Sequence, residues 1–282
     1  MTIRMPTFPR CGAALLSKAV LVGFLMMTGR AFAVEVSGLY DAETIVTGRG
    51  EAERLRGFGI GLSEVIVKLS GDARSAQSAA VQQLLPRADE FVERYEYEDR
   101  MKGIPIHDEQ GTRDRPHYLR MTFKHAAVDE ALKRLGLPRW GSDRPRLIVW
   151  LGIKDSVRSY VLDSETEFGF GQREVLKSVS RQRGVPLVLP APESPARTSV
   201  TYADIAHGDL PRMRSASMPY GADAILYGTL VMDKNGYWTA VWSLDWNKRA
   251  RRNEMHGVTF DVALRTAVER AAKTFSTSAP HG

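Results

Sequence analysis

Few side chains in this sequence have the types and spacing needed for catalysis or metal binding, and those few are scattered along the chain. The six histidines form no H-E-x-x-H pair, and neither G-x-S-x-G nor S-x-x-K occurs. His107-Asp108-Glu109 is a run of neighbours whose side chains point in different directions, which disfavours a metal site. We expect no catalytic residue, metal ligand or cofactor. A dispersed Ser-His-Asp or paired-carboxylate site stays open, because such sites need geometry rather than spacing.

A short basic run is the main candidate for a binding surface. Its cations are Lys248, Arg249, Arg251 and Arg252, which follow Trp246 closely. We expect residues 247–252 to form a loop between two strands. A charged loop of this kind is commonly a solvated turn. The functional interpretation is contact with an anionic surface, namely a lipid headgroup, a glycan or an acidic partner.

The segment 221–246 must position that run, and it reads as a hairpin. Asn235-Gly236 between two apolar stretches indicates a type I′ turn. Alternation along the second strand places five residues on one face: Trp238, Ala240, Trp242, Leu244 and Trp246. A two- or four-residue loop would pair that face with Ile225, Tyr227 and Val231. We expect this tryptophan row to be core rather than a stacking platform for sugars or bases.

The hairpin belongs to the second of two expected α/β domains. Residues 34–138 predict a first domain, and residues 146–278 predict a mixed sheet in the order β-α-β-α-β-β-β-α. The turn-rich segment 136–145 separates them. It contains Trp140 and Arg144, which we expect to make the interdomain contact, with Trp140 partly exposed.

The first domain should be built on a helix with apolar residues at helical spacing, ending at Gly71. Gly57, Gly59 and Gly61 lie inside that pattern, and we interpret them as permitting close packing rather than anion binding. Two alternating strands, 95–99 and 118–124, should follow. Leu119, Met121 and Phe123 should then face the core.

Residues 1–33 resemble a secretory signal peptide. Basic residues precede a short apolar run, and Ala31-Phe32-Ala33 fits an A-x-A cleavage site, which places the new N-terminus at Val34. An uncleaved anchor is the alternative, although the run is shorter than the roughly 20 residues that span a bilayer. The only cysteine, Cys11, would be removed, leaving no thiol or disulfide. We expect a periplasmic protein with no transmembrane segment after processing.

The charge of the chain argues against nucleic-acid binding. The formal net charge is +6, and the expected signal segment holds four basic and no acidic residues. The processed chain would therefore carry a charge near +2, too little for binding nucleic acid through bulk charge.

Several segments resemble an uncharacterised proteobacterial family of exported proteins, catalogued as a domain of unknown function of the DUF2066 type. They are VSGLYDAETIVTG, VIVKLSGD, GLPRWGSDRPRLIVWL, RGVPLVLP, GADAILYGTL and GYWTAVWSL. The resemblance transfers no functional residues. The C-terminal half also looks like the small α/β domains of envelope lipoproteins that bind other proteins, an analogy of fold alone.

These observations favour a non-catalytic binding or assembly factor of the cell envelope, with an envelope protein or an anionic surface as partner. One alternative is a hydrolase acting on a cell-wall or glycan substrate. Another is binding of a small anionic ligand in an interdomain cleft lined by residues 140–146.

Overall fold

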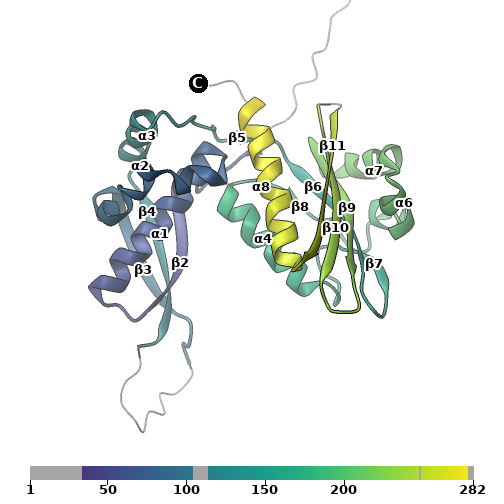
Figure 1. Ribbon diagram of the computed structural model, residues 1–282, viewed down its shortest axis with the longest axis horizontal. Coiled ribbons are helices and arrows are strands. Elements are labelled where there is room, and N and C mark those ends of the chain that lie inside the picture. The colour runs from purple at the N-terminus through teal and green to yellow at the C-terminus, as the bar shows by residue number, and fades with distance from the viewer. Residues whose placement is uncertain (1–33, 104–113, 248, 279–282) are drawn as a thin grey trace, which may run out of the picture. The chain divides into compact units, whose positions relative to one another are not determined.

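The computed structural model describes residues 34–103, 114–247 and 249–278, all of which lie within one compact unit, residues 31–282. These residues form sheets of two, six and three strands together with helices, so the predicted mixed α/β class is confirmed (Figure 1). The division into domains at 34–138 and 146–278 stays a prediction. The expected signal segment, Cys11 and Ala33 included, lies outside the described residues, and Val34 is the first described residue.

The N-terminal part contains a three-stranded antiparallel sheet. Its strands, in spatial order, are β2 (Asp41–Thr47), β4 (Pro116–Phe123) and β3 (Val92–Asp99). Helix α1 (Glu51–Ser70) packs on one face, where Leu119, Met121 and Phe123 are buried as predicted. A Cβ on Gly57 would lie 2.6 Å from the Leu119 side chain, and one on Gly61 would collide with Met121. The predicted close-packing role of these two glycines is therefore confirmed.

Helix α1 ends where the sequence predicted, because Gly71 adopts the left-handed conformation at φ 71°. Four short helices complete this part: η1 (Ala73–Gln77), α2 (Ala79–Gln82), η2 (Leu85–Phe91) and α3 (His125–Arg134). The strand predicted over residues 95–99 is present as β3, which begins three residues earlier, at Val92.

Residues 34–47 contain two separate strands. Strand β1 (Val34–Glu35) pairs with β5 (Asp143–Arg144), and β2 begins only after a turn in which Gly38 has φ 69°. Segment 136–145, predicted to be turns alone, therefore contributes a short strand.

The six-stranded sheet occupies the C-terminal part. Its strand order is β11-β10-β9-β6-β7, with β8 also paired to β6. The strands are β6 (Leu147–Lys154), β7 (Ser159–Val161), β8 (Leu187–Val188), β9 (Ala224–Met232), β10 (Trp238–Trp246) and β11 (Arg249–Val258). Strand β6 runs parallel to β8 and β9 and is buried over seven of its eight residues, which explains its continuous apolar sequence.

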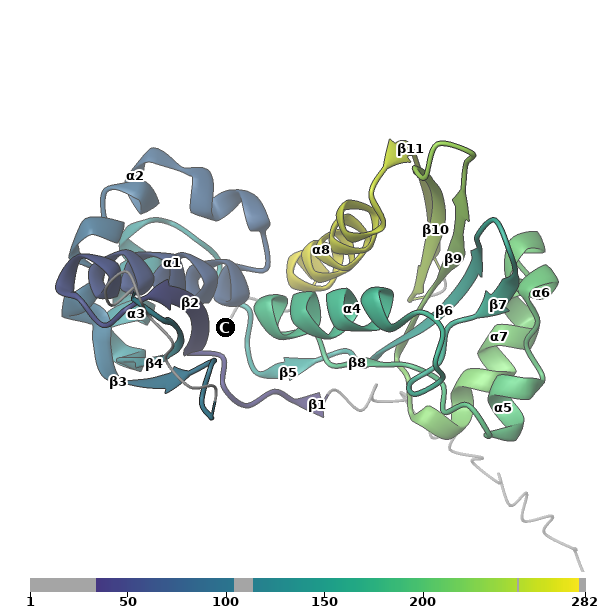
Figure 2. The same ribbon diagram turned by 90° about the horizontal axis from the view of Figure 1, so that it is seen from below.

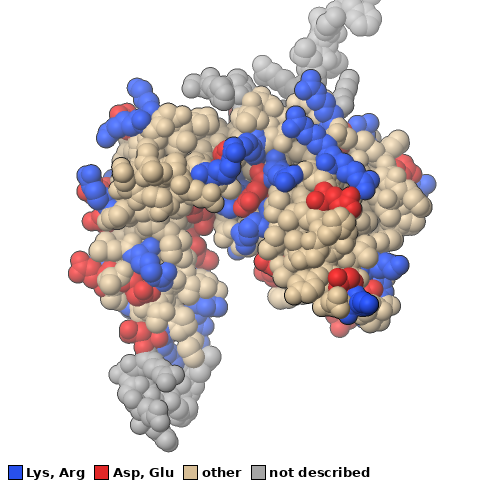
Figure 3. Space-filling view, viewed as in Figure 1, with Lys and Arg blue, Asp and Glu red and all other residues tan. Residues whose placement is uncertain are grey.

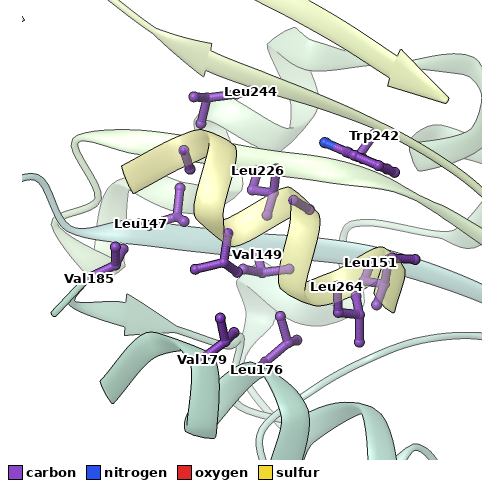
Figure 4. Packing of buried hydrophobic residues seen from close by; sticks show 14 of the residues in the cluster. Leu147, Val149, Leu151, Leu176, Val179, Val185, Leu226, Trp242, Leu244 and Leu264 are labelled. Atoms are coloured by element: carbon purple, nitrogen blue, oxygen red, sulfur yellow. The ribbon is translucent and has the colours of Figure 1, made fainter. Parts of the chain in front are cut away.

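Helices cover both faces of this sheet (Figures 1 and 2). Helices α4 (Phe170–Arg183) and α8 (Phe260–Ser278) enclose the larger core, in which side chains from both helices meet those of β6, β9 and β10 (Figure 4). The other face carries α5 (Pro195–Thr198), α6 (Tyr202–His207), α7 (Leu210–Ser217) and η3 (Met218–Tyr220). The predicted order of elements omitted β7 and merged several of these short helices.

The β9–β10 hairpin exists, but its turn differs from the prediction. Gly236 has φ 84°, whereas Asn235 does not adopt a positive φ, so the turn is not type I′. The Asp233 amide donates to the Tyr237 carbonyl at 2.7 Å, which encloses a three-residue loop. An odd loop length reverses the predicted parity. The tryptophan face consequently pairs with the other residues of β9: Leu226, Gly228, Leu230 and Met232.

Candidate functional site

The basic run lies in a strand, not in a loop as predicted. Arg249, Arg251 and Arg252 belong to β11, which pairs with β10 in antiparallel register. Lys248 lies outside the described residues. The strand is possible because β11 is the end strand of the sheet, where charged side chains remain in water. The prediction failed because the run has no apolar alternation of its own.

The register sends the arginines to opposite faces of the sheet. Arg249 lies opposite Trp246 and Arg251 opposite Leu244, so both share the face covered by α8. Arg252 lies opposite Ser243 on the other face, where Glu254 is 3.8 Å from its guanidinium. Within the described residues, no carboxylate forms an ion pair with Arg249 or Arg251.

A further cation from α8 borders this edge. Exposed Arg270 donates to the side-chain oxygen of Asn253 on β11, which ties the helix to the strand. Figure 3 shows Lys and Arg side chains gathered over the region of β11 and α8. This basic edge, defined here as Arg249, Arg251, Arg252 and Arg270, can bind anionic groups along an exposed strand.

The tryptophan row is core. Trp238 and Trp242 are each 5% exposed, and Trp246 packs edge-on to Phe275 at 5.0 Å between ring centroids. Trp242 lies against Gly228, where a Cβ would overlap the backbone of β10. These rings cannot serve as a stacking platform and instead hold β10 against α8.

Arg144 is fully buried and forms the most extensive polar contact of the structure's described part. All five of its N–H groups donate to main-chain carbonyls, at 2.9–3.2 Å, from Lys68, Trp140, Gly141, Arg183 and Gly184. Several of these carbonyls lie at the C-terminal ends of α1 and α4, where the helix dipoles place negative charge. The contact is structural, because no donor is left for a ligand.

Trp140, which we expected to be partly exposed, is 2% exposed. The Arg144 guanidinium lies 3.8 Å from the centroid of the Trp140 ring. The main-chain amide of Trp140 donates to the Leu69 carbonyl at 2.7 Å. Burial lowers the pKa of Arg144 to about 9, so the side chain is still a cation at neutral pH.

A cleft of about 1140 Å³ lies beside α1 and the end of α4. Lys68 is buried in its wall, donates to the Asp41 carbonyl at 2.7 Å and is 3.7 Å from Glu64. Burial raises the pKa of Glu64 and lowers the pKa of Lys68. Arg181, with an exposed side chain, lines the same cleft, which therefore offers both hydrogen-bond donors and acceptors.

A second cavity of about 640 Å³ is lined in part by residues 140–143, which belong to the stretch 140–146 that was expected to line a ligand cleft. Tyr40 and His125 stack within it at 3.8 Å between ring centroids. The Tyr40 hydroxyl donates to Asp129 at 2.6 Å and accepts from Arg139 at 3.0 Å. Burial is the main cause of the raised pKa of Tyr40.

None of the described histidines is hydrogen-bonded to another. Buried His117 accepts from Arg49 at 3.2 Å, and exposed His256 is 3.0 Å from Glu254. His207 is exposed, whereas His107 and His281 lie outside the described residues. Across residues 34–103, 114–247 and 249–278, no three His, Cys, Asp or Glu side chains are placed to hold a metal ion.

One family model is similar to part of the chain. The family described as "Domain of unknown function (DUF8605)" matches residues 33–141. The expected domain of unknown function is therefore present, and it covers the three-stranded sheet with α1 and α3. The family that matched is not the DUF2066 type that the sequence motifs suggested.

No protein with a curated description matches the chain. One solved crystal structure, of an uncharacterized protein, is similar over 46% of this chain and 88% of its own, at 9% identity and a TM-score of 0.22. A likeness at this level carries no argument about function. In the described ranges, none of the helices combines the length and apolar character needed to cross a membrane.

Proposed function

We propose that this protein is a non-catalytic binding or assembly factor of the cell envelope that recognises its partner through the basic edge. The observation that carries the proposal is the position of Arg249 and Arg251. Both are exposed on the end strand of the larger sheet, without an acidic partner among the described residues. Unpaired cations fixed on a rigid strand are suited to an anionic partner.

We also propose that the chain is exported to the periplasm with cleavage between Ala33 and Val34. Support comes from the basic and apolar residues before an A-x-A motif. Membership of a proteobacterial exported family, as the DUF2066-type motifs suggest, belongs to the same proposal.

Site-specific crosslinking in intact cells tests the proposed function. A photo-crosslinking residue replaces exposed Ala250 on β11, and the matched control replaces exposed Ala126 on α3. We expect position 250, but not position 126, to capture an envelope protein that mass spectrometry identifies. Repeated capture of no envelope protein at position 250 contradicts the proposal.

Binding of a small anionic ligand in the 640 Å³ cavity is a second candidate function. Arg94 and Arg139 line this cavity together with His125, which places several donors around one space. A thermal-shift screen against anions and nucleotides tests it, because a ligand at 100 times its Kd stabilises a protein by about 2.7 kcal/mol. An unchanged Tm throughout the library removes this candidate.

A further inference from the structure

The outer side of β11 is an open strand edge in the described structure. Strand β11 stands at the end of the strand order and is hydrogen-bonded there to β10 alone. Regular pairing with β10 runs from Arg249 to Met255, and the register shifts beyond that point. An edge of this length has the backbone donors and acceptors needed to pair with another extended segment.

The charges along this edge select the partner. Arg249 and Arg251 are two residues apart on one face of the sheet, which separates their Cα atoms by roughly 6.6–6.8 Å along the strand. Acidic side chains at alternate positions of an added strand repeat at the same spacing. A second copy of this edge would instead bring arginines close together, which disfavours pairing between identical chains.

Arginines project from both faces of β11, and this distinguishes an extended peptide from a flat membrane as the partner. Arg249 and Arg251 face α8, whereas Arg252 projects from the opposite face. A membrane lying on either face would meet only part of the basic edge. A peptide lying along the strand edge is bordered by arginines on both faces.

We propose that β11 binds an acidic, extended peptide segment by strand addition, with acidic residues at alternate positions facing Arg249 and Arg251. This inference rests on the proposed function and specifies the partner's chemistry. Hydrogen bonds between the two backbones would supply the geometry of binding, and the alternating carboxylates would set the register.

Two labelled peptides of identical composition test the proposal by fluorescence anisotropy with the purified full chain. Both contain Thr, Val and three Glu, which occupy every second position in one peptide and every third position in the other. We expect the alternating peptide to bind about tenfold more tightly, because only its carboxylates lie two residues apart on one face of a strand, as Arg249 and Arg251 do. N-methylation of its amides that face β11 should abolish binding, since these groups can no longer donate hydrogen bonds to the strand.

A charge-reversal variant provides a second test of strand addition. R249E/R251E should lose the preference for the alternating Glu peptide and gain one for the matching Lys peptide. The control R87E/R134E makes the same charge change at two exposed arginines away from β11 and should bind like the original protein. R249Q/R251Q replaces the reversed variant if circular dichroism shows that the latter is unfolded, and it should lose the preference without the reversal.

Equal affinity for the two peptides, or binding that survives N-methylation, would overturn strand addition. Binding to phosphatidylglycerol vesicles without binding to either peptide would do the same and would assign the edge to a membrane. The proposed function is judged separately. If Ala250 captures an envelope protein while the peptides show no preference, the binding role stands and strand addition is wrong.

Discussion

At the scale of single residues, the stability of this protein depends on polar groups that have no charged partner. Arg144 is a buried cation whose five hydrogen bonds all end on main-chain oxygens. The planar guanidinium suits this arrangement, because its five donors have fixed directions. A smaller ammonium group could satisfy only some of the same carbonyls.

Replacement of Arg144 should therefore be severe. We expect R144M to lower the free energy of unfolding by about 3 kcal/mol or more, since each buried carbonyl left without a donor costs about 1–3 kcal/mol. R144K should lose less, because it retains the charge. Urea denaturation measures both, with exposed R181M as the control. A loss in R144M no larger than that in R181M would show that the contact contributes little.

Gly228 provides a second prediction for a single residue. A Cβ there would collide with the Val241 carbonyl and lie 2.6 Å from the Cα of Trp242. We expect G228A to reduce stability by about 1–3 kcal/mol through overpacking. In the control G141A the added Cβ has no heavy atom within 4 Å. Similar midpoints for the two variants in denaturant would contradict the prediction.

Sequence patterns predicted buried residues well where the apolar spacing repeats over a long enough segment. The helical spacing located α1 and its end at Gly71, and alternation identified the buried face of β4. Arg144 was expected to take part in an interdomain contact, but its five hydrogen bonds could not be predicted, because their acceptors are backbone carbonyls that any sequence contains. The Glu64–Lys68 pair has the i, i+4 spacing of a surface ion pair, and only the tertiary structure shows that it is buried.

At the scale of elements, the length of one loop decides which face of a strand is buried. The three-residue connection between β9 and β10 places Leu226 and Leu230 opposite the tryptophan row. Asn235-Gly236 correctly indicated a hairpin, but the dipeptide alone does not determine loop length. The basic run was likewise misassigned, because a charged strand is stable at an edge through its pairing with β10. Two-residue strands such as β1 and β5 leave no periodic signal.

The side chain of Asp233 stabilises this connection. Its Oδ1 accepts hydrogen bonds from the amides of Asn235 at 2.8 Å and Tyr237 at 2.9 Å. We expect D233A to reduce the free energy of unfolding by about 1 kcal/mol, the usual net contribution of such bonds. Guanidinium denaturation of D233A beside the neighbouring variant K234A measures the effect. Equal stability of the two variants would show that the side chain does not hold the turn.

At the scale of the whole molecule, ion pairs connect elements that are distant in sequence. Asp72, which follows α1, lies 3.1 Å from Lys273 of α8 and 2.9 Å from Arg74. These partners, with Arg74 first, hold the pKa of the Asp72 carboxyl well below its ordinary value of about 4. The stabilisation is complete above that value and is lost as pH falls below it, because the unfolded chain then takes up the proton first.

Asp72 should therefore contribute to the acid sensitivity of the protein. We expect D72N to lower the Tm by about 2 °C at pH 7, with a smaller difference at pH 3. Calorimetry at the two pH values measures this, and E90Q, which removes an exposed pair with Arg87 within one short segment, is the control. A Tm difference that is equal at both pH values would contradict the assignment.

The contacts of Arg144 have a consequence for the order of folding events. Its acceptors at Lys68 and Gly184 are 76 and 40 residues away along the chain. Closing loops of that length is entropically costly, so these bonds should form after the rate-limiting step. Substitution of Arg144 would then accelerate unfolding and leave the refolding rate almost unchanged, giving a φ-value near zero in a chevron experiment. On this basis the hydrogen bonds of Arg144 form late in folding, and they determine how long the native state persists rather than how quickly it is reached.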